Sequence, residues 1–165
     1  MIDPLELLLK IAKEKTKLGK WDNQPFQLIK VMPNTIKGDL AEIFVNEYSK
    51  ELGFEVDERV SRLGDYDARI NGMTFEVKMA TEDISGNFQF NHIRYDYEYE
   101  WILCLGVTPD TILFDIWSKA DLATGKAGKL VTMGRGQNAS FKLTKSKNSL
   151  RPITELKSRI QALSA

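Results

Sequence analysis

The sequence of 165 residues has little cysteine, little histidine and no long apolar run. A single cysteine, Cys104, excludes an internal disulfide and a multi-thiolate zinc site, and the single histidine, His92, excludes sites that need two imidazoles. No stretch approaches the ~18 apolar residues of a membrane span. The N-terminus places an acid before a short apolar stretch, which is not the charge order of a signal peptide. We therefore expect a cytoplasmic protein without membrane association, whose chemistry rests on carboxylates, lysines and oxygen-held metal.

The composition is that of one globular domain. Apolar residues make up 42% of the chain and charged residues 28%, which is typical of folded proteins. The length suits one domain rather than two, and no repeat or linker divides the sequence. We predict a single domain over residues 1–165, with a core at about 34–123 and a basic portion at 118–165.

The net charge of zero hides an uneven distribution. Residues 1–117 hold 13 lysines and arginines against 21 acids, a balance of −8, and residues 118–165 hold 10 against 2, a balance of +8. A basic portion on an acidic body suggests a surface for a polyanion. A solvated basic face that serves solubility is the alternative.

Helical and strand patterns alternate along the chain. Asp3 and Pro4 begin a predicted helix with Leu5, Leu8, Leu9 and Ala12 on one side, ending at Gly19. Asn34 or Thr35 begins a second, and Gly53 follows its end; its apolar arc is Ile36, Leu40, Ile43, Phe44, Tyr48 and Leu52. Strands are predicted at 54–60, 67–79 as a hairpin, 102–107, 111–117 and 141–143, with a short helix after Ser118, a glycine-rich loop at 132–140 and a closing helix from Pro152. This order predicts an α/β layered domain with a mixed sheet.

The hairpin brings two acids together. Asn71-Gly72 is a strong two-residue turn signal, and it places Asp67 opposite Glu76, and Asp65 opposite Lys78. Opposite residues project to one face with Cβ atoms about 5 Å apart, so the carboxylates of Asp67 and Glu76 repel each other. A divalent cation between them reverses that repulsion. The hairpin therefore predicts an acidic metal site with a lysine beside it.

Tyr66-Asp67 followed by Glu76-Val77-Lys78 resembles the PD-(D/E)xK nuclease signature, and the resemblance extends over about residues 37–122. It implies the restriction-endonuclease-like fold, a three-layer α/β arrangement with a mixed central β-sheet flanked by helices. It also implies Mg²⁺, with Mn²⁺ as a substitute, held by Asp67, Glu76 and the main-chain carbonyl of Val77. Lys78 would orient or activate the attacking water, and Glu42 matches the helix glutamate that many members add.

Some assignments within this resemblance stay open. Tyr66 stands where proline is usual, Asp65 competes with Asp67 as the first acid, and Glu42 has an ordinary solvated glutamate as its alternative. A second Glu-x-Lys, Glu155-Leu156-Lys157, falls in the closing helix, where its side chains point to different sides. We interpret that copy as structural.

Two regions are candidates for contact with DNA. Gln89, Asn91 and Arg94 follow the hairpin, and these residue types read adenine or guanine in the major groove; a connector with core aromatics is the equal alternative. Arg135, Lys142 and Lys145 belong to the basic portion and are candidates for phosphate contacts. His92 is expected to be a packing or hydrogen-bonding residue.

These features predict a Mg²⁺-dependent endonuclease of double-stranded DNA, most consistent with a type II restriction enzyme or its catalytic subunit. One site cuts one strand, so a homodimer or a complex with a larger subunit is expected. The alternatives are a Holliday-junction resolvase of the same fold and a non-catalytic DNA-binding or assembly subunit.

Overall fold

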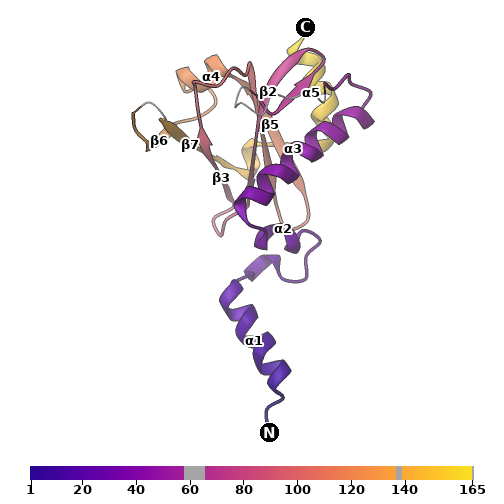
Figure 1. Cartoon of the computed structure of the whole chain (residues 1–165), viewed down its shortest axis with the longest axis vertical. Helices are drawn as coiled ribbons and strands as arrows, with labels where there is room; N and C mark the ends of the chain where they lie inside the picture. Colours follow the sequence, from indigo (N-terminus) through magenta and orange to yellow (C-terminus); the bar gives the residue numbers. More distant parts are fainter. Residues whose placement is uncertain (58–65, 137–138, 165) are drawn as a thin grey trace.

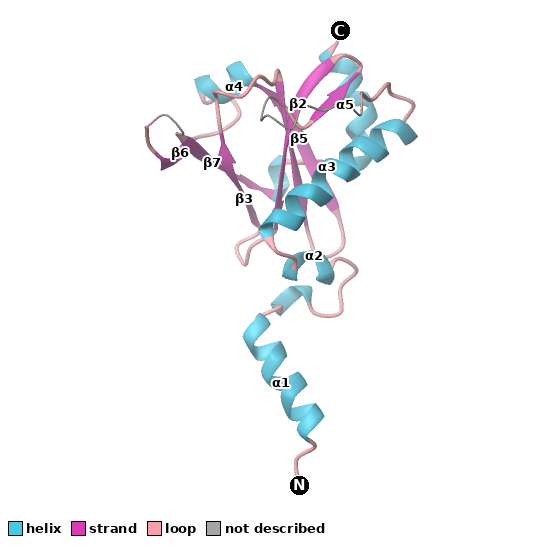
Figure 2. Cartoon of the chain, in the orientation of Figure 1, coloured by secondary structure: helices cyan, strands magenta, loops and turns pink. Residues whose placement is uncertain are grey.

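The computed structural model describes residues 1–57, 66–136 and 139–164. Its helices are α1 (Pro4–Thr16), α2 (Gln27–Val31), α3 (Asn34–Glu51), α4 (Lys119–Thr124) and α5 (Leu156–Leu163), with single 3₁₀ turns at Gly19–Trp21, Lys147–Ser149 and Ile153–Glu155. Its strands are β1 (Ala68–Ile70), β2 (Met73–Thr81), β3 (Asn87–Ile93), β4 (Trp101–Val107), β5 (Ile112–Ser118), β6 (Leu130–Gly134), β7 (Ser140–Ser146) and β8 (Arg151–Pro152). The predicted mixed α/β class is confirmed (Figures 1 and 2).

The main sheet has the order β1-β2-β4-β5-β8, in which only β2 and β4 run parallel. The predicted hairpin register is confirmed from Ala68 to Ile70, because Ala68 pairs with Phe75 and Ile70 with Met73. Asn71 and Gly72 have φ of 49° and 79°, the two positive values that this type of turn requires. The turn thus fixes which side chains of β1 and β2 share a face.

Two apolar clusters lie on opposite faces of this sheet. The first packs β1, β2, β4 and β5 against α3 and α5, and it includes Val45, Phe75 and Ile160. The second packs the same sheet against β3, β7 and α4, and it includes Phe88, Phe90 and Leu122. β2 therefore sends Phe75 and Val77 into the first cluster, while Glu76 and Lys78 project to the other face.

The second sheet, of order β3-β7-β6, corrects two predictions. Residues 88–95 are not a connector: β3 places Phe88 and Phe90 in the core and leaves Gln89 and Asn91 exposed. The loop predicted at 132–140 begins later, because residues through Gly134 pair with β7 as strand β6. The strand predicted at 54–60 is reduced to one bridge from Val56 to Ile70 among its described residues.

The buried face of α3 also differs from the predicted arc. Ile36 and Ile43 are exposed, whereas Ala41, Val45 and Ser49 are fully covered. Small residues at this spacing let the helix lie close to the sheet, which a wheel of large apolar residues does not show. The side of α3 next to this stripe carries Glu42.

The first helix projects away from the rest of the chain (Figure 1). It ends at Thr16 rather than near Gly19, because Lys17 takes a left-handed conformation that ends the helix. Over the whole of Pro4–Thr16, which the structure describes completely, no side chain is buried. Across the described residues, no helix combines the length and apolarity needed to cross a bilayer.

Candidate active site

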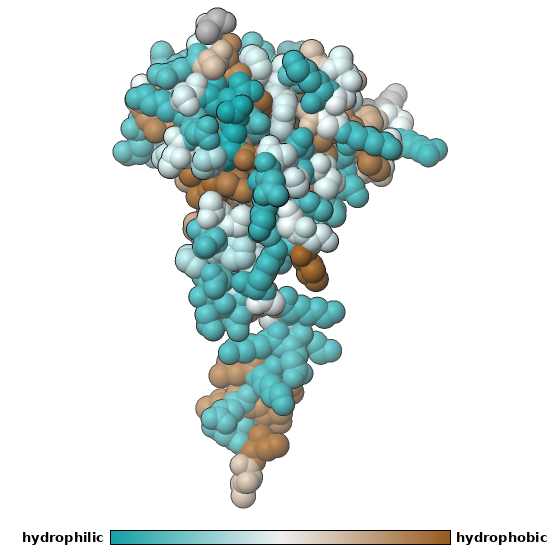
Figure 3. All heavy atoms as spheres, turned by 180° about the vertical axis from the view of Figure 1, so that it is seen from behind, coloured by the Kyte–Doolittle hydropathy of each residue, from teal (hydrophilic) through white to brown (hydrophobic). Residues whose placement is uncertain are grey.

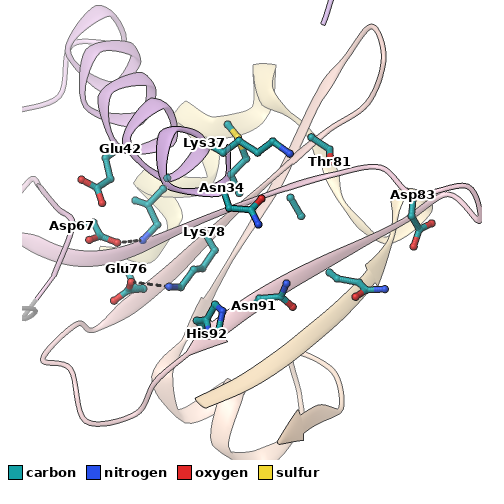
Figure 4. Close-up of a pocket in the computed structure, with 15 residues that line it drawn as sticks. Asn34, Lys37, Glu42, Asp67, Glu76, Lys78, Thr81, Asp83, Asn91 and His92 are labelled. Atoms are coloured by element: carbon teal, nitrogen blue, oxygen red, sulfur yellow. Dashed lines mark hydrogen bonds and ion pairs between the residues drawn. The ribbon is translucent and has the colours of Figure 1, made fainter. Parts of the chain in front are cut away.

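A cleft of about 530 Å³ opens along one edge of β2, between α3 and β3. β1 pairs with β2 only over Met73–Phe75. In the described ranges, no strand pairs with that edge beyond this point, so residues 77–81 border the cleft. Figure 4 shows the side chains that reach into it from α3, β2 and β3. The predicted residues Glu42, Asp67, Glu76, Val77, Lys78, Gln89 and Asn91 all line it.

Asp67 lies directly before β1 and is fixed by backbone contacts. Its N–H donates to the carbonyl of Phe75 at 2.9 Å, the residue with which Ala68 already pairs, so the regular hairpin register ends at Ala68. Its carboxylate accepts from the N–H of Val77 at 2.8 Å. Asp67 thereby satisfies the first donor on the open edge of β2 and is held beside Glu76.

Glu76 and Lys78 project from β2 to the same face. The Lys78 Nζ lies 3.3 Å from a Glu76 carboxylate oxygen, and these side chains are only 20% and 7% exposed. The pKa of Glu76 is raised to about 7, first by burial and then by the charge of Asp67, and Lys78 opposes this rise. One lysine therefore only partly offsets the cost of gathering these acids.

Glu42 comes from α3 and adds a third carboxylate to the same end of the cleft. Its pKa is also raised to about 7, first by burial, then by the charge of Asp67 and a hydrogen bond to it. An ordinary solvated glutamate does not show such a shift. Glu47, on the same helix, is exposed and pairs with Lys50. The structure thus places Glu42 with the acidic group.

The rest of the cleft is lined by amides and a further cation. Asn34 and Lys37 lie at the start of α3, and Asn91 of β3 lies across from them (Figure 4). Gln89 of β3 lines the cleft as well. Burial and the neighbouring charge of Lys30 lower the pKa of Lys37. Asn34 and Lys37 were not predicted as site residues, because Lys37 stands five residues before Glu42, a spacing that does not place two side chains on one face of a helix.

His92 lines the cleft as well, in a backbone conformation unusual for a side chain with a Cβ. Its φ is 59°, and the register of β3 with β7 shifts between Phe90 and Ile93. This bulge lets both Asn91 and His92 face the cleft, where strict alternation would turn one away. Of the two roles expected of His92, packing is wrong, because the residue is exposed and lies in the cleft (Figure 4); a hydrogen-bonding role stays a prediction.

The chemistry of the donors suits a hard divalent cation. Asp67 and Glu76 supply carboxylate oxygens, and a cation would relieve both causes of the raised pKa of Glu76, its burial first and then the charge of Asp67. Within the described residues, no group of three or more histidine, cysteine, aspartate or glutamate side chains stands ready as a metal site. Mg²⁺ needs no such group, because it binds through one or two carboxylates and keeps several waters.

The other predicted DNA contacts lie in different environments. Lys142 shares a face of β7 with Thr144, which pairs with Gln89 on β3, so Lys142 faces the cleft side. Lys145 faces the core: its Nζ donates to the carbonyl of Ala127 at 2.7 Å and lies 5.1 Å from the Trp117 ring.

Arg94 and Arg135 lie outside the cleft lining. Arg94 pairs with Asp96 and lies over the ring of Tyr97, and Arg135 is exposed after β6. Contact of these residues with DNA stays a prediction. Asp65, the alternative first acid, lies outside the described residues.

Comparisons with known proteins give structural likenesses but no family. No family model and no curated protein matches the chain. Among solved structures, the chain is similar to the bacterial homing endonuclease I-Ssp6803I, at 12% sequence identity and a TM-score of 0.49, over 81% of this chain and 99% of that one. At this level of similarity, the likeness assigns neither a fold family nor an activity to this chain.

Proposed function

We propose that this chain is a metal-dependent DNA endonuclease of the PD-(D/E)xK type, with Asp67, Glu76 and Lys78 as its catalytic residues. The observation that carries the proposal is the convergence of these side chains with Glu42 at one end of the cleft. A scaffold without such chemistry gains nothing from three repelling carboxylates beside a half-buried lysine.

Each residue has a role that follows from its position. Asp67, Glu76 and the carbonyl of Val77 would hold Mg²⁺, which when bound supplies positive charge for the phosphodiester under attack. The ammonium of Lys78, held beside Glu76, would orient the attacking water. Glu42 would help to set the charge of the site from α3.

The far part of the cleft suits the nucleic acid. Phosphate oxygens accept hydrogen bonds from amides and lysines, and Asn34, Lys37, Gln89 and Asn91 supply such donors. We propose double-stranded DNA as the substrate, with Gln89 and Asn91 as the side chains that read bases. A type II restriction enzyme or its catalytic subunit is the form of this activity that we favour.

The direct test is incubation of the full chain with plasmid DNA and Mg²⁺, followed by mapping of the fragments. We expect cleavage that chelation abolishes, with discrete ends if bases are read. Cleavage of a synthetic four-way junction but not of linear duplex would show that the chain is a junction resolvase rather than a restriction enzyme. Absence of cleavage on either substrate, with no Mg²⁺ or Mn²⁺ binding by calorimetry, would leave a non-catalytic DNA-binding subunit.

Glu76→Gln and Lys78→Ala are expected to lower the cleavage rate by at least ~100-fold, because the first removes a charge that would hold Mg²⁺ and the second removes the ammonium that would orient the attacking water. Lys157→Ala, in the second Glu-x-Lys, is the matched control and should cleave at the wild-type rate. Turnover is measured at fixed Mg²⁺ with circular dichroism as the check on folding. If Lys78→Ala retains near wild-type turnover, the catalytic assignment is wrong.

A further inference from the structure

The apolar side of α1 has no partner in the described chain. Leu5, Leu8 and Leu9 are 71%, 65% and 62% exposed. With Ala12 they form a stripe at the helical spacing i, i+3, i+4 and i+7. Figure 3 shows apolar side chains gathered on the projecting helix, away from the body of the molecule. We call these four residues the leucine stripe.

A helix of this length does not persist without packing. α1 has 13 residues, and it is well capped, because the N–H of Leu5 donates to Asp3 Oδ1 at 2.9 Å. Even so, helices shorter than about 12–15 residues are marginal in water, and most helical stability in proteins comes from burying an apolar face. We therefore expect another surface to cover the leucine stripe and so stabilise α1.

We propose that the leucine stripe is a docking surface for α1 of a second copy of this chain, in antiparallel orientation. A two-fold axis between Leu8 and Leu9 sets Leu8 of one copy level with Leu9 of the other. It also sets each Leu5 level with Ala12 of the partner copy. A large side chain then meets a small one at both ends, which is the complementarity that close helix packing needs.

The charges beside the stripe select this partner and this direction. Glu6, Lys10 and Lys13 lie along one flank of it, at the spacing i, i+4 and i+7. In the antiparallel pair, each Glu6 lies level with the interval between Lys10 and Lys13 of the other copy, so opposite charges meet twice. In a parallel pair this flank would face the opposite flank of the partner helix, so Glu6 would not meet Lys10 or Lys13 of the other copy. The helix dipoles also oppose favourably only in the antiparallel arrangement.

The inference is independent of the nuclease proposal, because its measurement involves no DNA. The full chain is examined by sedimentation equilibrium from micromolar to hundreds of micromolar concentration. We expect a reversible monomer–dimer equilibrium, and we expect Leu8→Glu to abolish the dimer. Ile84→Glu is the matched control: Ile84 is fully exposed in a loop, and its substitution should leave the equilibrium unchanged. A wild-type chain that stays monomeric, or a dimer that Leu8→Glu leaves intact, would overturn the proposal.

Charge reversal tests the direction of pairing. Glu6→Lys should raise the dimer dissociation constant about tenfold, since two attractions become repulsions. The triple variant Glu6→Lys, Lys10→Glu, Lys13→Glu should restore it. A parallel pair predicts no weakening from Glu6→Lys.

Cross-linking of cysteine variants tests the antiparallel orientation a second time. The native Cys104 is buried, so it should not cross-link. A mixture of Leu5→Cys and Ala12→Cys chains should form a disulfide-linked heterodimer under mild oxidation, whereas Leu5→Cys alone should not cross-link. A basic amphipathic helix can also bind a lipid surface. Flotation with vesicles containing phosphatidylserine tests this alternative. Flotation of a chain that stays monomeric in solution would refute pairing between copies.

Discussion

At the scale of single residues, the cleft is defined by groups whose protonation depends on one another. Glu42 and Glu76 both have pKa values of about 7, raised from an ordinary value near 4.5 first by burial and then by Asp67. Because metal binding requires deprotonated carboxylates, proton and metal compete for this end of the cleft. We therefore expect Mg²⁺ affinity to fall as the pH drops below 7.

The metal-free chain should show the opposite trend in stability. Between pH 4.5 and 7 the folded state holds protons on Glu42 and Glu76 that the unfolded state has released, so lowering the pH through this window stabilises the fold. Above pH 7 the full cost of the charged carboxylates is present. Thermal melts in chelator at pH 8 and pH 5 measure this. The change in Tm should be smaller in Glu76→Gln than in wild type, while Glu47→Gln should follow wild type. Equal pH dependence in Glu76→Gln would mean that Glu76 does not carry the effect.

Substitutions at His92 can separate the effect of its backbone strain on stability from the role of its side chain in cleavage. Its φ of 59° costs about 1 kcal/mol in a residue with a Cβ and little in glycine. We expect His92→Gly to unfold at the same urea concentration as wild type or higher. If the imidazole contacts DNA, His92→Gly should nevertheless cleave more slowly. A loss of stability in His92→Gly that exceeds the loss in His92→Ala would contradict this account of the bulge.

At the scale of elements, the segment before α3 is tied to the main sheet by one buried carboxylate. Glu82, 4% exposed, accepts from Lys20, which also donates to the carbonyl of Asp83 at 2.7 Å. Lys147 approaches the same carboxylate at 3.8 Å. The N-terminal segment, the end of β2 and the turn after β7 therefore meet at Glu82.

Glu82→Ala should lower the free energy of unfolding by about 2 kcal/mol, because it leaves a charge-assisted hydrogen bond unmade and the lysines without their acid. Glu47→Ala, which removes an exposed pair with Lys50 on α3, should change it by less than ~0.5 kcal/mol. Urea denaturation of both variants gives the comparison. Equal effects would show that the cluster at Glu82 behaves as an ordinary surface pair.

Elements with a local signal were predictable and those set by long-range packing were not. The turn at Asn71-Gly72 fixes the pairing of β1 with β2 over the few residues on either side of it, so the proximity of Asp67 and Glu76 could be predicted from the sequence. The apolar run 102–107 likewise marks β4. β3 was missed as a strand because its alternation breaks at the Asn91–His92 bulge. Lys37 joined the site only through tertiary packing of α3, which no periodicity reports.

At the scale of the whole molecule, the division between acidic and basic portions is less complete than in the sequence. Within the basic portion, Arg151 and Arg159 both contact Asp115, at 3.4 and 3.2 Å, and Lys145 is used in the core. Their charges serve internal contacts that link β5, β8 and α5. The predicted phosphate contacts that remain are Lys142 on β7 and Arg135 directly after β6.

The double variant Lys142→Gln, Arg135→Gln should flatten the slope of log K against log salt for duplex binding by up to about 2, because each phosphate that loses its cationic partner changes the slope by roughly 0.9. Binding is measured by fluorescence anisotropy without divalent metal, so that cleavage does not interfere. Lys157→Gln, on α5, is the control and should leave the slope as in wild type. An unchanged slope in the double variant would mean that these two residues do not contact DNA and that DNA binds through the cleft alone.

The short β1 leaves β2 with an open edge at residues 77–81, and such an edge invites strands of other molecules to pair with it and aggregate. Here the groups that line the cleft also guard the edge: the Asp67 carboxylate occupies the Val77 N–H, and the Lys78 ammonium places a charge beside it. Removing either side chain therefore changes the cleft. It also leaves backbone groups on the edge of β2 free to pair with a strand of another molecule. Substitutions that keep shape and polarity, such as Asp67→Asn, preserve this protection, whereas replacement by a large apolar residue would promote self-association and reduce the yield of folded protein.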